Sequence, residues 1–209
     1  SLSDEYSVAS FIATLEFIQR TLKISQFAPP DEFKQVEYGT IVKIKIADQS
    51  GLNDYVLSGC DGLVEGHNIS LGTVIVPASE TGLIKNWLGA GSIKITDSAN
   101  ANVTNGYKIE VVYEGADYED TYIQVVPRTV TVRVNFAPSE VEEGVAIDPS
   151  AYRIEQGSFV YGDKLTVSVV GNKFVAVVRD FSGENDRSSY YNVIFNYIQT
   201  ENQVKEESI

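Results

Sequence analysis

The sequence offers few of the side chains on which enzyme chemistry usually depends. Its 209 residues include one His, one Cys, one Trp and no Met. A single histidine excludes a multi-histidine metal centre, and a single cysteine excludes an internal disulfide bond and a cysteine-rich zinc site. No nucleophile elbow, phosphate-binding loop or dinucleotide fingerprint occurs in the sequence. We therefore predict a protein that is not an enzyme and binds no cofactor.

His67 and Cys60 are the two residues that could still take part in catalysis. His67 directly follows a turn glycine, which favours an exposed turn residue over a general base. A nucleophile–base pair also needs a third group to orient it, and the sequence offers none. No cation flanks Cys60 to stabilise a thiolate, so we interpret both residues as structural.

A cluster of acids, Asp180, Glu184 and Asp186, is the candidate for metal binding. Carboxylate oxygens are ligands that calcium accepts, so these three residues are the candidate calcium ligands. Their spacing is not that of a helix–loop–helix calcium site, and the related turn at residues 97–102 carries fewer acids. A solvated hairpin turn is the favoured interpretation, and we predict no metal site.

The segment 73–91 contains the candidate ligand-binding residues Lys85, Asn86 and Trp87. An exposed Trp beside a cation and an amide could stack on a sugar ring or anchor a protein partner. The favoured alternative is a short helix that plugs one end of the β fold. Its apolar residues at helical spacing are Leu83, Ile84, Trp87 and Leu88.

The net charge restricts the class of partner. Sixteen Lys and Arg residues stand against 29 Asp and Glu residues, which gives a net charge of −13 at pH 7. Nucleic acids and anionic membranes bind through clustered cations, so this excess of acid disfavours both. No segment approaches the ~20 apolar residues that a membrane helix needs. We predict a protein or glycan partner, no nucleic acid and no membrane insertion.

Residues 1–24 carry apolar side chains at steps of three and four, which predicts one amphipathic helix. Pro29 and Pro30 cannot continue a helix, so we place its end at or before Phe27. The helix could dock on the neighbouring domain, self-associate with another copy or belong to a longer coil. The apolar positions are Val8, Phe11, Ile12, Leu15, Ile18 and Leu22.

From Val36 onward the period of the apolar residues changes to two, which is typical of strands with one buried face. Many short strands separated by turns predict a sandwich or a barrel. The clearest alternating runs are residues 42–46, 130–134 and 165–169.

Two stretches of alternating residues repeat 191 − 107 = 84 positions apart. They are Tyr107, Ile109, Val111 and Tyr113, and then Tyr191, Val193, Phe195 and Tyr197. Upstream, Gly66 corresponds to Gly162, and we match the strand at 42–46 with that at 130–134. We predict a helix and linker at 1–35, β domains at 36–127 and 128–200, and a polar tail at 201–209.

Three motifs of the second copy carry a resemblance to a known family. They are a proline-led Thr/Val strand, a Gly-Asp turn before another Thr/Val strand, and a closing Tyr/Asn/Val strand, at residues 127–132, 161–169 and 189–195. In this order they resemble the mostly bacterial immunoglobulin-like (MBG-type) repeats of bacterial surface adhesins. The first copy fits at residues 63–70 and 93–97, although its insertion at 73–91 departs from the pattern.

The resemblance implies an all-β fold of two tandem Ig-like β-sandwich domains, here preceded by one N-terminal amphipathic helix. It implies a non-enzymatic adhesin or stalk segment outside the cell or at its surface, which spaces or presents a binding surface. Two alternatives remain. One is a virion or filament subunit whose helix 1–24 drives assembly, and the other is a carbohydrate-binding module that uses Trp87.

Overall fold

The computed structural model describes residues 18–45, 60–112, 121–200 and 203–208, which are mainly strands joined by turns and short 3-10 helices. The strands of the first part are β1 (Arg20–Ser25), β2 (Gln35–Glu37), β3 (Ile41–Ile44), β4 (Cys60–Asp61), β5 (Asn68–Leu71), β6 (Val74–Pro77), β7 (Gly82–Ile84), β8 (Ile93–Thr96), β9 (Tyr107–Val112) and β10 (Ile123–Val126). The second part contains β11 (Arg128–Val134), β12 (Tyr152–Gln156), β13 (Lys164–Val170), β14 (Lys173–Arg179), β15 (Tyr191–Thr200) and β16 (Gln203–Ser208). The 3-10 helices are η1 (Asp31–Phe33), η3 (Ala90–Ser92), η4 (Thr104–Gly106), η6 (Pro138–Glu140), η7 (Pro149–Ala151) and η8 (Ser188–Tyr190).

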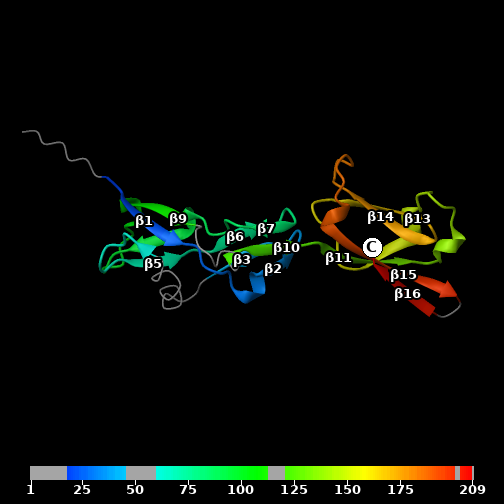
Figure 1. The fold of residues 1–209 in the computed structure, drawn as a ribbon, viewed down its shortest axis with the longest axis horizontal. Helices are drawn as coiled ribbons and strands as arrows, with labels where there is room; N and C mark the ends of the chain where they lie inside the picture. Colours follow the sequence, from blue (N-terminus) through cyan, green and yellow to red (C-terminus); the bar gives the residue numbers. More distant parts are fainter. Residues whose placement is uncertain (1–17, 46–59, 113–120, 201–202, 209) are drawn as a thin grey trace, which may run out of the picture.

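Pro127 divides the strands into two halves. Every strand pairing among the described residues joins strands on the same side of this proline. Strand β10 of the N-terminal half ends at Val126, and β11 of the C-terminal half begins at Arg128. The halves therefore follow each other end to end along the long axis of the molecule (Figure 1).

The small sheets of the N-terminal half form two groups, which we call the outer and the inner tier. The chain passes from one tier to the other repeatedly. The outer tier consists of the sheet β4-β1-β9 and the pair β5-β8. The inner tier consists of the sheet β2-β10-β7 and the pair β3-β6. Figure 1 places the inner tier between the outer tier and the C-terminal half. The expected alternation holds in β3, where Val42 and Ile44 are buried while Lys43 is exposed.

The C-terminal half consists of the sheet β12-β11-β15-β16 and the hairpin β13-β14. Its core contains Val130, Val132 and Val134 of β11, each fully buried. The ring of Phe174 on β14 lies 5.4 Å from that of Phe195 on β15, so the inward faces of the hairpin and the larger sheet pack together.

Part of the predicted N-terminal helix is wrong, because Arg20–Ser25 forms strand β1. Leu22 and Ile24 are buried on one side of this strand, and β1 runs parallel to β9 with Arg20 opposite Tyr107. Pairing with a distant strand overrides a local period that favoured a helix. Residues 20–25 thus belong to the first set of sheets, ahead of the start expected at Val36. The rest of the predicted helix, residues 1–17, lies outside the described residues.

The polar tail predicted at 201–209 contains a strand. Strand β16 pairs antiparallel with β15, and Lys205 lies opposite Tyr197. A ladder of backbone hydrogen bonds needs no apolar side chains, so composition alone did not reveal this strand.

The match of residues 42–46 with residues 130–134 is also wrong. Strand β11 runs parallel to the closing strand β15, with Arg128 opposite Tyr191. In the N-terminal half the strand in that position is β1, with Arg20 opposite Tyr107, whereas β3 pairs antiparallel with β6.

Candidate functional site: the joint between the halves

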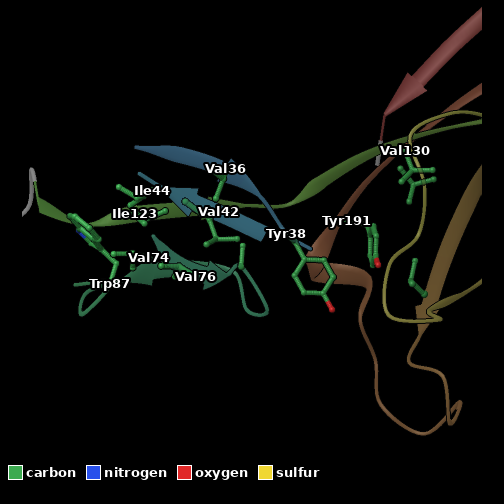
Figure 2. Packing of buried hydrophobic residues seen from close by; sticks show 14 of the residues in the cluster. Val36, Tyr38, Val42, Ile44, Val74, Val76, Trp87, Ile123, Val130 and Tyr191 are labelled. Atoms are coloured by element: carbon green, nitrogen blue, oxygen red, sulfur yellow. The ribbon is translucent and has the colours of Figure 1, made fainter. Parts of the chain in front are cut away.

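Tyr38 lies where the two halves meet. It follows β2 and is only 2% exposed. Rings of the C-terminal half surround it, with centroid distances of 5.5 Å to Tyr161, 4.8 Å to Tyr190 and 5.5 Å to Tyr191. Figure 2 shows Tyr38 at the end of the inner tier, facing Tyr191. A tyrosine of one half is therefore buried in an aromatic cluster supplied by the other.

We call this region the joint. It comprises Glu37, Tyr38, Gly39, Glu80, Arg128, Thr129, Val160, Tyr161, Arg187, Tyr190 and Tyr191.

The backbone brings Tyr38 to the joint through β2. Val36 of this strand is buried in the N-terminal core, and the Tyr38 amide donates to the carbonyl of Val126 at 2.9 Å. Gly39 then turns the chain with φ of +81°, a conformation that favours glycine. A Cβ atom on Gly39 would lie 2.5 Å from Cγ2 of Val160, so the halves approach too closely there for a side chain.

Arg128 ties the linker to both halves. Its Nη1 donates to the carbonyl of Tyr38 at 3.1 Å, and its Nε donates to the carbonyl of Ser158 at 2.9 Å. The next residue, Thr129, donates its amide to a carboxylate oxygen of Glu37 at 3.2 Å. These bonds restrict rotation of one half about Pro127 relative to the other.

A second set of polar contacts lies on the surface of the joint. The hydroxyl of Tyr190 donates to the carboxylate of Glu80, which lies between β6 and β7. The Arg187 guanidinium is 3.8 Å from the same carboxylate and stacks over the Tyr190 ring at 4.9 Å. Because Glu80 is largely exposed, this ion pair adds little stability, although it links a loop of one half to a loop of the other.

The buried phenols of Tyr38 and Tyr191 stay protonated at neutral pH. Burial, with the nearby negative charge of Asp163, raises the pKa of Tyr38 to about 12. Burial and the hydrogen bond to Asp163 raise the pKa of Tyr191. A phenol held in its neutral form is a poor nucleophile and a poor base at pH 7. The chemistry of the joint is therefore packing and hydrogen bonding.

Tyr191 also stabilises the turn that precedes β13, through hydrogen bonds of its hydroxyl group that we call a brace. Its hydroxyl contacts Asp163 Oδ2 at 2.7 Å and accepts from the amide of Val160 at 3.1 Å. Val160 of this turn also lies against Gly39 of the N-terminal half. The hydrogen bonds of Tyr191 therefore stabilise the turn that the N-terminal half contacts.

His67 occupies the corresponding place in the N-terminal half. Its Nδ1 lies 2.6 Å from the hydroxyl of Tyr107, and that hydroxyl accepts from the amide of Val64 at 3.2 Å. His67 is half-buried, so the exposed turn residue predicted here is instead a partner of Tyr107. The arrangement matches that of Asp163 with Tyr191.

The three residues predicted to bind a ligand lie away from the joint. Trp87 is 3% exposed, and its Nε1 donates to the carbonyl of Thr121 at 2.7 Å. Lys85 and Asn86 are exposed beside it. The plug interpretation is right that Trp87 and Leu88 are buried. It is wrong about the helix, because residues 82–84 form β7, and wrong about Leu83, which is 54% exposed. A ligand at the surface has no access to the buried indole.

Gln26 is a buried polar residue that sequence reasoning missed. It is 6% exposed, and its Nε2 donates to the carbonyl of Lys85 at 2.8 Å and to that of Thr121 at 3.0 Å. The ring of Phe27 meets that of Trp87 edge-on at 5.3 Å. These contacts fasten the loop after β7 to the segment after β1.

The candidate calcium ligands lie in a hairpin turn after β14. Oδ1 of Asp180 accepts from the Ser182 hydroxyl at 2.7 Å, and its Oδ2 accepts from the Asn185 amide at 2.6 Å. Hydrogen bonds from Asn185 and Ser182 hold the pKa of the Asp180 carboxyl well below its usual range. Asp186 accepts from the amide of Ser188. The turn's own donors thus occupy these two carboxylates, and no hydrogen bond of Glu184's side chain is seen within the described residues.

Two features are absent from the described parts of the chain. Over these ranges, no group of three or more His, Cys, Asp or Glu residues is arranged to hold a metal ion. No described helix is long and apolar enough to cross a membrane. Comparison with known proteins finds no matching family model, curated protein or solved structure.

Proposed function

We propose that this chain is a non-enzymatic spacer segment of a bacterial cell-surface adhesin, in which two Ig-like β-sandwich domains form a stiff extended unit. In this role it sets the distance and orientation at which a binding surface is presented outside the cell. The supporting observations are the recurring contacts of the two halves, their end-to-end order and the packing of the joint.

The recurrence of contacts supports two copies of one domain. In each half a 3-10 helix precedes the closing strand, the first tyrosine of that strand braces a turn, and the closing strand runs parallel to the opening one. A hydroxyl of the 3-10 helix accepts from the preceding strand in both halves. The matched residues are Tyr107 and Tyr191, Val64 and Val160, Thr104 and Ser188, and Arg20 and Arg128.

The burial of Tyr38 is the main observation that supports a stiff connection between the two halves. Flexible linkers leave the ends of adjacent domains in water, whereas Tyr38 is 2% exposed among rings of the other half. Bending at Pro127 would expose this side chain, at a cost of about 1.5–3 kcal/mol. The two halves therefore move as one body.

One observation weighs against each of the two alternatives. For the filament subunit, Arg20–Ser25 at the end of the expected helix forms a strand, while residues 1–17 lie outside the described residues. The carbohydrate-binding module needed an exposed indole, but Trp87 is buried.

Small-angle scattering and unfolding together test the spacer. The full chain is expected to show an extended shape whose maximum dimension does not change with salt. Tyr38→Ala is expected to broaden the distance distribution through bending at Pro127, and Phe181→Ala is the control because Phe181 is 73% exposed. An unchanged distribution in folded Tyr38→Ala, or a wild-type chain that already samples bent shapes, contradicts the proposal.

A further inference from the structure

We propose that a groove beside the joint is a binding site for a neutral polyhydroxylated ligand such as a hexose. This inference goes beyond the spacer role and does not depend on it. A groove of about 380 Å³ lies beside the linker, between Glu37 of the N-terminal half and the outer face of β11, β12 and β15. Its volume is within the range of small-molecule sites, ~300–1,000 Å³. The lining residues that matter here are Glu37, Thr129, Thr131, Gln156, Ile194 and Asn196.

The buried side chain of Thr131 is the feature that points to a ligand. Its neighbours Val130 and Val132 face the core, so Thr131 faces the groove, where it is 9% exposed. Among the described residues none hydrogen-bonds to its hydroxyl group. A buried hydroxyl without a partner costs about 1–3 kcal/mol, and buried polar groups are nearly always paired. A group in the groove that exchanges hydrogen bonds with Thr131 removes this cost.

The strand is also irregular at this point. The register of β11 with β12 shifts between Thr131 and Val132. Such bulges re-aim side chains and are frequent beside binding sites.

The other lining groups select the class of ligand. The Gln156 amide and the Thr129 hydroxyl can both donate and accept. The Asn196 amide donates one hydrogen to Glu155 and keeps a second hydrogen and its oxygen. One Glu37 oxygen accepts from the Thr129 amide, while the other can accept from a ligand. None of the described lining residues is cationic, so a phosphate or carboxylate ligand has no counter-charge and is repelled by Glu37. Closely spaced donors and acceptors without a counter-charge match the hydroxyl groups of a neutral sugar, with Ile194 against an apolar patch of the ring.

The test is a titration of the full chain followed by amide chemical shifts. The probes are D-glucose, D-galactose, D-mannose and N-acetyl-D-glucosamine, each up to ~50 mM, with D-glucuronate as the charged counterpart. At least one neutral sugar is expected to shift the amides of Thr129, Thr131 and Gln156, with a dissociation constant on the order of 1 mM. Glucuronate is expected to bind at least about tenfold more weakly, and Glu37→Gln is expected to narrow that difference.

Thr131→Val is the decisive variant, because it removes the hydroxyl and keeps the shape of the side chain. It is expected to weaken sugar binding at least about tenfold, while the exposed Thr166→Val, the control on β13, leaves binding unchanged. The midpoint of unfolding of the free Thr131→Val protein is expected to stay the same or rise, since a buried unpaired hydroxyl is lost. The proposal is overturned if no neutral sugar shifts these amides, if Thr131→Val binds as well as the wild type, or if the shifts map elsewhere. A groove that holds only water gives the first of these results.

Discussion

The ring of Tyr38 lies edge-on to the ring of Tyr191, with centroids 5.5 Å apart and an interplanar angle of 87°. This pair joins the two halves, since Tyr38 follows β2 and Tyr191 begins β15. Edge-on aromatic pairs add about 0.5–1.5 kcal/mol to the effect of burial. The joint thus resembles part of a protein core, and the following experiments probe it and the contacts that support each half.

Substitution of Gly39 tests how closely the halves approach. Gly39→Ala is expected to lower the free energy of unfolding by about 2–4 kcal/mol, because a Cβ there adds a collision with Val160 to the strain of a positive φ. Gly144 has φ of +79° with open space around it, so Gly144→Ala measures the strain alone and should cost only about 1–2 kcal/mol. Chemical denaturation of both variants gives the comparison. Equal losses would show that the contact with Val160 is absent in solution, and Val160→Ala added to Gly39→Ala should restore part of the difference.

Alkaline pH is expected to loosen the joint. The pKa of Tyr38 is raised to about 12 by burial, above its unfolded value of about 10, so the folded state holds its proton more tightly. The resulting stabilisation is fully present below pH ~10 and is lost as the pH rises toward the folded value. Denaturation midpoints between pH 8 and pH 11.5 should therefore fall, and less so in Tyr38→Phe. Tyr161→Phe serves as the exposed control, and the same decline in Tyr38→Phe as in the wild type would contradict the assignment.

Exchange of His67 tests whether the two halves use the same brace. Since Asp163 holds Tyr191 as His67 holds Tyr107, His67→Asp is expected to change the free energy of unfolding by less than about 0.5 kcal/mol. His67→Ala removes the partner of the buried Tyr107 side chain and should cost about 1–2 kcal/mol. Thermal unfolding at pH 7.5 distinguishes the two outcomes. If His67→Asp proves as damaging as His67→Ala, the two braces are not equivalent.

The single Trp provides an optical test of burial. Trp87 is 3% exposed and donates to Thr121, so its fluorescence should be blue-shifted and protected from acrylamide. Trp87→Ala is expected to cost about 3–5 kcal/mol, whereas Leu83→Ala, at a side chain 54% exposed, should cost under about 1 kcal/mol. Emission typical of a solvated indole, or a shift on adding sugar, would place Trp87 at the surface.

The sequence predicted the mainly β character of the chain because strand periodicity is local. The alternation of Val42 and Ile44 with Lys43 identifies a half-buried strand without knowledge of its partner. The correspondence of His67 with Asp163 was also visible, because each follows a turn glycine. Their contacts with tyrosines were not, since Tyr107 lies 40 positions from His67.

The errors arose where a partner distant in sequence decides the structure. Leu22 fits the apolar stripe of a helix as well as the inward face of a strand, and pairing with β9 selects the strand. The sequence around Trp87 does not show whether the indole faces a ligand or the backbone of Thr121. Only the folded loop shows that it faces Thr121. Likewise, nothing near Tyr38 in the sequence shows that rings 123 to 153 positions later enclose it.

The amino-acid sequence by itself determined the strand content, the acidic charge and the scarcity of catalytic side chains, because these depend on residue type and on spacing along the chain. The tertiary structure alone decided the joint and its groove, because Tyr38 meets Tyr191, and Glu37 meets Thr131, only after each half has formed its own sheets. Contacts of such long range depend on the register and direction of strands, which a local pattern of residues does not encode.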